Sequence, residues 1–224
     1  NLGPVVNTKG RDGGPALSAD GRTLIFHSAR SGGQGSWDLW MSTWDSPGEP
    51  FGEPVDMGPV VNSSEIDSHP ALSKDGRTLI FVRGGKTSHD LWMSTRISTS
   101  EPFGEPVNMG PIVNRGEDNI GPNLSDNGRT LIFTSKVQRR ASQWKSTRAA
   151  SDQPFGKPVD FETGIKGLTV QAPTIWTDGR TLIFTAGGDR GHGNYDQWMP
   201  TRTAVGEPFS SPVNLGADIN SSEF

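Results

Sequence analysis

Short apolar runs separated by turn residues recur along the whole chain, and no stretch has the spacing of an amphipathic helix. The clearest run, Gly-Arg-Thr-Leu-Ile-Phe, occurs four times, at residues 21–26, 76–81, 128–133 and 179–184. Its copies begin 51 to 55 residues apart, which is typical of an array of one supersecondary unit. Asp or Asn precedes the glycine in every copy, and this pair predicts a tight primed hairpin turn with positive φ.

Each repeat predicts four short strands. In the first repeat an inner strand begins at Pro15, and the second strand contains Leu24, Ile25 and Phe26. Because these three apolar residues are consecutive, both faces of that strand are expected to be covered. A variable Gly-rich segment leads to the third strand, and a Pro-rich connection leads to a short fourth strand. One tryptophan recurs in the third strand and is expected to pack between units: Trp40, Trp92, Trp144 and Trp198.

Units of about 50 residues with four strands indicate the blades of a β-propeller. One blade cannot bury both faces of its sheet, whereas blades stacked around an axis can. The sequence therefore predicts an all-β fold, a β-propeller with four blades of four antiparallel strands, as a single domain over residues 1–224. The repeats are expected at about 1–54, 55–106, 107–158 and 159–212, with a tail at 213–224.

The two ends of the chain carry copies of the same element. Residues 1–7 and 214–220 both resemble an outer strand with the loop that leaves it. Candidate outer strands lie at residues 1–3, 55–58, 107–110, 159–161 and 213–216, one more than four blades need. A closed ring with one surplus copy is favoured, because an open array exposes strand edges and apolar faces. A segment of a longer propeller array is the alternative, and a first residue other than Met indicates a processed product or an excerpt.

Composition narrows the function classes. The formal net charge is −4 with no basic stripe, so nucleic acid is not an expected partner. No apolar run approaches membrane-spanning length, so membrane insertion is not expected either. The chain has no cysteine, which excludes disulfides and thiolate zinc sites.

The repeated block Pro-Ala-Leu-Ser-x-Asp-Gly-Arg-Thr-Leu-Ile-Phe, followed by a loop and Asp-Leu-Trp-Met-Ser-Thr, resembles the WD40-like repeat of TolB-type β-propellers. The resemblance covers essentially the whole chain, although the third repeat departs from it at Asn123 and the fourth at residues 174–177. It implies a bacterial propeller that is periplasmic or secreted. It implies no catalytic residues, because this repeat occurs in scaffolds, in peptidase-associated propellers and in some polysaccharide lyases.

In such a blade the loop entering the inner strand and the loop between the second and third strands emerge on the same face. Variable loops on a repeated scaffold usually carry function, so this loop face is the expected ligand-binding surface. Its candidate residues are Asp12, Glu65, Asp67, His69, Asp118, Asn119, Arg30, Arg83, Arg190, Trp37 and Tyr195. Trp37 and Tyr195 end the variable loops, where an aromatic ring can stack on a sugar or a peptide.

Asp12, Asp67 and Asn119 lie three residues before the proline that opens the inner strand of their repeats. In a closed ring their oxygens would surround the axis, an arrangement suited to Ca²⁺. The alternative is that each side chain caps the main chain of its own loop, as in Asx turns. The four histidines occupy different places in their repeats, so no repeated histidine dyad is expected, and only His69 and His192 are expected on the loop face.

Two functions remain open from the sequence. The first is a non-catalytic binding or scaffold propeller whose loop face takes a protein, a peptide or a glycan. The second is a carbohydrate-active hydrolase or lyase at the mouth of the axial channel, with a divalent cation as an optional cofactor. A cluster of buried carboxylates with shifted pKa values at that mouth would favour the enzyme.

Overall fold

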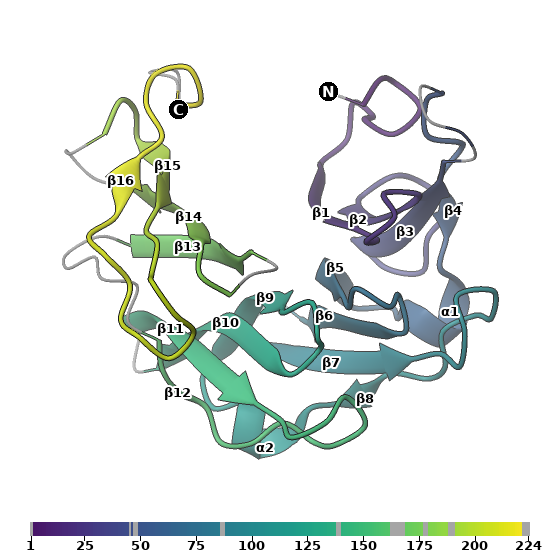
Figure 1. Ribbon diagram of the computed structural model, residues 1–224. Coiled ribbons are helices and arrows are strands. Elements are labelled where there is room, and N and C mark those ends of the chain that lie inside the picture. The colour runs from purple at the N-terminus through teal and green to yellow at the C-terminus, as the bar shows by residue number, and fades with distance from the viewer. Residues whose placement is uncertain are drawn as a thin grey trace.

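The computed structural model describes residues 2–44, 46, 49–85, 88–137, 140–161, 169–176, 179–187 and 191–220. Its strands form four antiparallel blades, each ordered from the centre outward as in the chain (Figure 1). The first blade contains β1 (Asp12–Leu17), β2 (Thr23–Ser28), β3 (Asp38–Thr43) and β4 (Val55–Asp56). The second contains β5 (Ile66–Leu72), β6 (Thr78–Gly84), β7 (His89–Thr95) and β8 (Val107–Asn108).

The third and fourth blades repeat this plan. The third contains β9 (Asp118–Leu124), β10 (Thr130–Val137), β11 (Arg140–Thr147) and β12 (Val159–Asp160). The fourth contains β13 (Thr169–Ile175), β14 (Leu182–Gly187), β15 (Tyr195–Met199) and β16 (Val213–Asn214). A single parallel pairing between His89 and Asp118 joins the second and third blades into one continuous sheet. The predicted all-β propeller fold is confirmed.

The hairpin between the first two strands of each blade depends on its glycine. Gly21, Gly76, Gly128 and Gly179 all have φ between 64° and 71°, as the sequence predicts. The turn is longer than the expected two-residue turn: the Gly21 N–H donates to the Ser18 carbonyl, and the Ser18 N–H donates to the Thr23 carbonyl. Only the glycine of this turn is left-handed, which is the pattern of a type I turn followed by a glycine bulge.

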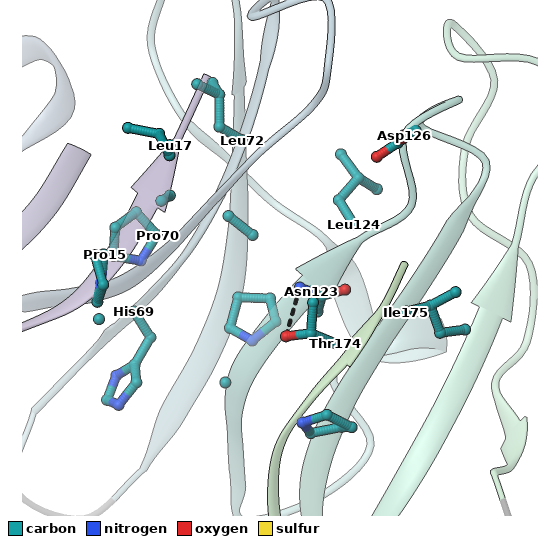
Figure 2. A pocket seen from close by; sticks show the side chains of 16 residues that line it. Pro15, Leu17, His69, Pro70, Leu72, Asn123, Leu124, Asp126, Thr174 and Ile175 are labelled. Carbon is teal, nitrogen blue, oxygen red and sulfur yellow. Dashed lines mark hydrogen bonds between the residues drawn. The ribbon is translucent and has the colours of Figure 1, made fainter. Parts of the chain in front are cut away.

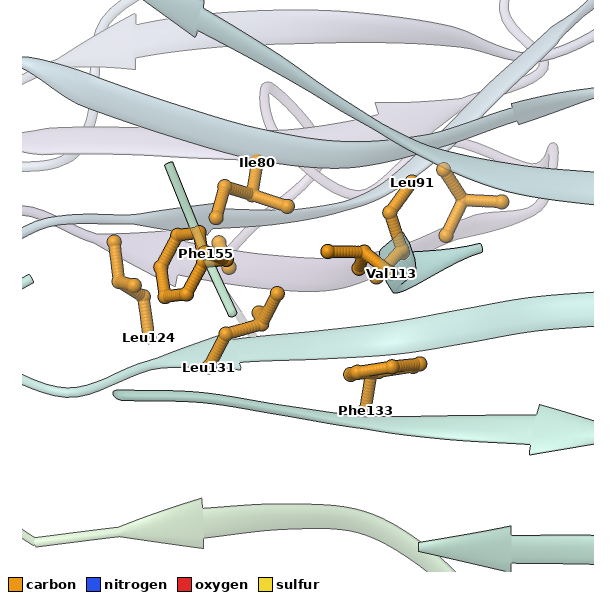
Figure 3. Close-up of a cluster of buried hydrophobic side chains, with 9 residues drawn as sticks. Ile80, Leu91, Val113, Leu124, Leu131, Phe133 and Phe155 are labelled. Atoms are coloured by element: carbon orange, nitrogen blue, oxygen red, sulfur yellow. The ribbon is translucent and has the colours of Figure 1, made fainter. Parts of the chain in front are cut away.

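The second strands form the joints between blades. Ile25 is fully buried in one cluster with Leu79 and Phe81 of the next blade. Ile80 packs in the same way with Leu131 and Phe133 (Figure 3). Each joint therefore sets one isoleucine against a Leu-x-Phe pair of the following blade, and burial of each such side chain stabilises the fold by roughly 1.5–3 kcal/mol. The expectation that both faces of the second strand are covered is confirmed in the first three blades, whereas Ile183 in the fourth is only partly buried.

In three blades an arginine that follows the third strand binds the turn between the first and second strands. These arginines were not predicted from the sequence. Arg96, Arg148 and Arg202 donate from Nε to the turn carbonyls of Gly76, Gly128 and Gly179, all at 2.7 Å. Each guanidinium also lies 4.4 to 4.5 Å from the ring centroid of a phenylalanine in its own blade: Phe103, Phe155 and Phe209. The first blade has Trp44 in this place, packed against Phe51.

Single-turn helices follow two of the outer strands. They are α1 (Gly58–Val61) and α2 (Gly110–Val113), each with a proline in its first turn. The sequence analysis did not predict them, because four residues are too few to show helical periodicity. Val61 and Val113 are the buried residues of these turns, and each packs into the joint between two blades.

The blades form an arc that is open between the first and the fourth (Figure 1), which differs from the favoured closed ring. Among the described residues, no hydrophobic cluster joins these two blades. The outer strand of the fourth blade is β16, so the surplus copy is the one at residues 1–7. Val6 of that copy covers the face of the first blade that carries Leu24, Phe26 and Trp40.

No helix in the described part of the chain is long and apolar enough to cross a membrane.

Candidate functional site

A pocket of about 410 Å³ lies where the four inner strands converge. Equivalent segments of the blades line it, residues 14–17, 69–72, 121–124 and 173–175, together with Asp126. Figure 2 shows Leu17, Leu72 and Asp126 toward one end of the pocket and His69 toward the other. The wall is mostly proline and aliphatic, and Asn123 Nδ2 of the third blade donates to Thr174 Oγ1 of the neighbouring fourth blade at 3.4 Å (Figure 2).

Every inner strand bends at the same place before its proline. The pairing register shifts there, between Gly13 and Ala16 in β1 and between Ser68 and Ala71 in β5. The residue at the bend is left-handed in the first three blades, with φ of 56° at Gly14, 49° at His69 and 59° at Gly121. This bulge turns the residues before the proline toward the axis.

His69 is therefore a strained residue. It is the one non-glycine residue with positive φ in the described part of the chain. An L-residue in this conformation costs about 1–2 kcal/mol, because its Cβ crowds the following carbonyl. Strain of this kind is characteristic of functional sites. The His69 side chain lies at the mouth of the pocket on the loop face (Figure 2).

Two further aromatic side chains lie beside His69. The ring centroid of His27 is 5.0 Å from that of His69 and 4.7 Å from that of Trp37. The His69 main-chain N–H donates to His27 Nδ1 at 3.1 Å. His27 Nδ1 is thus an acceptor, and the proton of the neutral ring is on Nε2. His27 is only 5% exposed, whereas the His69 side chain is open to the channel.

Both histidines are held in the neutral form. Burial is the main cause that lowers the pKa of His27 to about 4, and the nearby His69 lowers it further. Burial also lowers the pKa of His69 from its ordinary value, followed by the charge of His89. At neutral pH the mouth therefore presents an uncharged imidazole that can donate or accept a hydrogen bond.

His89 and Asp118 connect the second and third blades, and His89 is near enough to His69 for its charge to act on that imidazole. His89 Nδ1 lies 2.8 Å from Asp118 Oδ1, and Lys136 Nζ lies 3.6 Å from Asp118 Oδ2. The side chains of His89 and Asp118 are each about one-quarter exposed. Asp118 was expected on the loop face, whereas His89 was not.

Asp12, Asp67 and Asn119 occupy equivalent places, but their oxygens are hydrogen-bonded within their own blades. Asp12 accepts from the Ser28 hydroxyl at 2.6 Å, and Asn119 accepts from the Ser135 hydroxyl at 2.8 Å. Asp67 is fully buried and accepts from the main-chain N–H and the hydroxyl of Ser63. Burial raises the pKa of Asp12, but hydrogen bonds led by that from Ser28 outweigh it, so the pKa lies below its ordinary value. This is the geometry of the loop-capping alternative.

The arrangement bears on the expected Ca²⁺ site. Among the described residues, no group of three or more His, Asp or Glu side chains is placed to hold a metal ion. Asp12, Asp67 and Asn119 could offer a cation only those oxygens that they release from their own loops. The axial Ca²⁺ site stays a prediction.

Arg30 and Arg83 were expected to present charge to a ligand, but they lie between elements of the fold. Arg30 Nη2 is 3.0 Å from Asp12 Oδ1 and donates to the Val6 carbonyl at 2.6 Å. Arg83 Nε is 2.7 Å from Asp67 Oδ1, and its guanidinium lies 4.7 Å from the Trp92 ring centroid. These contacts hold each guanidinium against the blade.

The remaining candidates differ in exposure. Trp37 is half-buried beside His27, while Glu65 is exposed. Tyr195 is 51% exposed at the start of β15. Arg190 lies outside the described residues. Of the whole candidate set, the structure brings His69 and Trp37 together around His27, and it pairs Asp118 with His89 where the second blade meets the third.

The sequence reading missed His27 and His89 because it compared histidines by their place in the repeat. His27 meets His69, and His89 meets Asp118, because neighbouring blades are in contact. A comparison of equivalent positions within the repeat does not detect such contacts between blades. One signal was available: His69 stands directly before the inner-strand proline, where the first and third repeats have Gly14 and Gly121. The histidine in place of glycine was therefore a signal in the sequence for the site around His69.

No protein-family model and no curated protein matches this chain. Solved structures do match. TolB from Acinetobacter baumannii is 14% identical with a TM-score of 0.65, and the match covers 97% of this chain and 47% of the TolB chain. A thermostable family-43 glycoside hydrolase is 10% identical with a TM-score of 0.59, over 98% of this chain and 76% of that one. The α-L-arabinofuranosidase PaAbf62A from Podospora anserina, in complex with cellotriose, is 15% identical with a TM-score of 0.58, over 93% and 71%.

These similarities establish a TolB-like β-propeller fold. The chain spans about half the length of the TolB chain that it matches. At identities of 10% to 15% the matches carry the fold and no function.

Proposed function

We propose that the protein is a non-catalytic binding module that takes a peptide segment of another protein at the His69 mouth of the axial pocket. The observation that carries this proposal is the pocket lining. Proline and aliphatic side chains form most of the wall, and Asp126 is the one carboxylate among the described residues that line it. A site of this composition suits an apolar side chain, with a few polar groups to fix its orientation.

The polar groups at the mouth support a peptide ligand. His69 is neutral, so its imidazole can pair with a main-chain N–H or C=O group. The pair formed by His89 and Asp118 offers further polar groups where the second blade meets the third. Trp37 suits a sugar less well, because His27 already packs against its ring.

A carbohydrate-active hydrolase or lyase is the second candidate. Two arabinose- or glycoside-cleaving enzymes share the fold, and the second blade carries a strained histidine, His69, and a histidine, His89, that is paired with the carboxylate of Asp118. Glycosidases generally need two carboxylates that flank the scissile bond. Asp12 and Asp67 do not supply this pair, because both are hydrogen-bonded inside their blades.

Binding and catalysis can be separated with one substitution. His69→Gly places at the bend the residue that the first and third blades have there, so the fold is kept while the imidazole is removed from the pocket. The protein is screened against a displayed peptide library and a glycan array, and hits are measured by titration calorimetry. We expect peptide hits whose affinity falls at least tenfold in His69→Gly. Ile97→Asp, at a surface residue that is 88% exposed, is the matched control and should bind as the wild type does.

The result that contradicts the proposal is equally specific. Release of sugar from arabinoxylan or another polysaccharide, lost in His69→Gly or Asp118→Asn, would establish the enzyme. Glycan hits without turnover would keep the binding function and replace the peptide by a glycan.

We also propose a bacterial origin and a periplasmic or secreted location, on the resemblance of the repeat to TolB-type propellers. Fractionation of the source cells with an antibody against the chain tests the location, and recovery in the cytosolic fraction would contradict it.

A further inference from the structure

Four copies of one connection follow the blades or lead into them, and they differ in their surroundings. Each has the pattern of an aliphatic residue or methionine, glycine, three variable residues and asparagine. The copies are residues 2–7, 57–62, 109–114 and 215–220. We call the asparagine of each copy the clamp and the residue before it the knob.

The clamp binds the third strand of the preceding blade. Asn62 Oδ1 accepts from the Leu39 N–H at 2.9 Å, and Asn62 Nδ2 donates to the Leu39 carbonyl at 3.0 Å. Asn114 makes the same pair of hydrogen bonds with Leu91, and Asn220 makes it with Gln197. One side chain thus satisfies both main-chain groups of a strand residue.

The first clamp has no such strand among the described residues. Asn7 Oδ1 accepts instead from the Leu2 N–H of its own connection, at 2.8 Å. Asn7 is exposed, whereas Asn62 and Asn220 are 3% and 4% exposed. The N-terminal end of the arc therefore carries a clamp of the right sequence without its strand.

The last knob, Ile219, has no following blade to cover it among the described residues. Val6, Val61 and Val113 are 2% to 3% exposed, each against the apolar face of the blade that follows it. Ile219 occupies the same place and is 63% exposed. Ile183 of the fourth blade is also partly exposed, although Ile25 and Ile80 in that place are fully buried.

We propose that the two ends of the arc form a docking site for one further blade of the same repeat type. Its Leu-x-Phe face would cover Ile183 and Ile219, as the second and third blades cover the residues before them. Its third strand would supply the main-chain N–H and C=O groups that Asn7 lacks. The proposal extends the interface that already repeats between neighbouring blades.

A second copy of this chain fits the two ends less well. Its own Asn220 already holds Gln197, and its own Val6 already covers the first blade. One connection would be left over at each junction between copies. A single further blade uses Asn7 and Ile219 together and displaces neither Asn220 nor Val6 from its present contacts.

The first test compares clamps in the chain itself, by thermal unfolding. Asn62→Ala and Asn114→Ala leave main-chain groups unpaired in a joint, and we expect each to lower Tm by about 5 °C. Asn7→Ala should change Tm by less than about 1 °C. A loss at Asn7 equal to that at Asn62 would overturn the proposal, because Asn7 would already hold a strand.

The second test adds one further blade to the chain. A copy of residues 63–107 joined before Asn1 recreates the junction at Val107 and Asn108, since valine then precedes Asn1 and Leu2. In this extended chain we expect Asn7→Ala and Ile219→Asp each to lower Tm by about 5 °C, although neither does so in the original chain. If neither substitution lowers the Tm of the extended chain, the proposal is overturned. Light scattering on the original chain completes the test: a dimer that Ile219→Asp dissociates would make a second copy the occupant and overturn it as well.

Discussion

The inner strand of the second blade and those of the first and third follow the same path, but they place different residues at the bend. Gly14 and Gly121 adopt the left-handed conformation that glycine favours, whereas His69 adopts it against its preference. The scaffold needs only a glycine there. A residue that replaces glycine at such a left-handed position costs backbone energy, so its side chain is expected to have a role in the contacts that it makes.

The largest effect should come from the glycine next to His27. A Cβ on Gly14 would lie 2.8 Å from His27 Cε1 and Nδ1, whereas a Cβ on Gly121 meets nothing within 4 Å. We expect Gly14→Ala to lower the free energy of unfolding by about 3 kcal/mol or more, and Gly121→Ala by about 1–2 kcal/mol. Urea denaturation measures both. Equal losses would show that His27 moves aside, and Gly14→Ala combined with His27→Val should recover part of the difference.

Acid should act through His27. Its pKa is lowered from 6.5 to about 4 in the fold, so the unfolded chain binds the proton more readily. The stability from neutral His27 is full above pH 6.5 and is lost as the pH falls from 6.5 to about 4, by about 3 kcal/mol. Val82 stands in the second blade where His27 stands in the first, and the substitution His27→Val should therefore remove this pH dependence. Parallel stability curves for the two proteins between pH 7 and pH 4 would contradict it.

Relief of strain at His69 should be a smaller effect. His69→Gly removes a left-handed L-residue but adds freedom to the unfolded chain, so we expect a net gain of about 0.5 kcal/mol. Thermal unfolding at pH 7 measures it, alongside the loss of ligand affinity described above. A loss of stability would mean that the contact of His69 with His27 outweighs the backbone strain.

Metal removal should have the smallest effect. The oxygens of Asp12 and Asp67 are hydrogen-bonded to their own loops, so we expect EDTA and added Ca²⁺ to shift Tm by less than about 1 °C. A drop with EDTA that Ca²⁺ restores, and that Asp67→Asn abolishes, would establish the axial cation site.

The sequence by itself determined the blades. Its period, its turn glycines and its doubly apolar second strands were enough to predict the propeller, because turns and strand faces depend on residues that are close in the chain. The recurring tryptophans were correctly expected at the joints for Trp92, Trp144 and Trp198, whereas Trp40 packs against Val6 at the open end of the first blade.

Only the tertiary structure decided the site and the shape of the arc. His27 and His69 meet because the first and second blades lie side by side, and His89 pairs with Asp118 where the second blade meets the third, although residues 27, 69 and 89 share no place in the repeat. Arg30 and Arg83 belong to the blades rather than to a ligand surface, because carboxylates and carbonyls of other segments lie within their reach. Whether a ring closes depends on how two distant faces match, and here Val6 already covers one face while Ile219 leaves the other exposed. Local patterns fix the unit, and long-range contacts fix what the units form together.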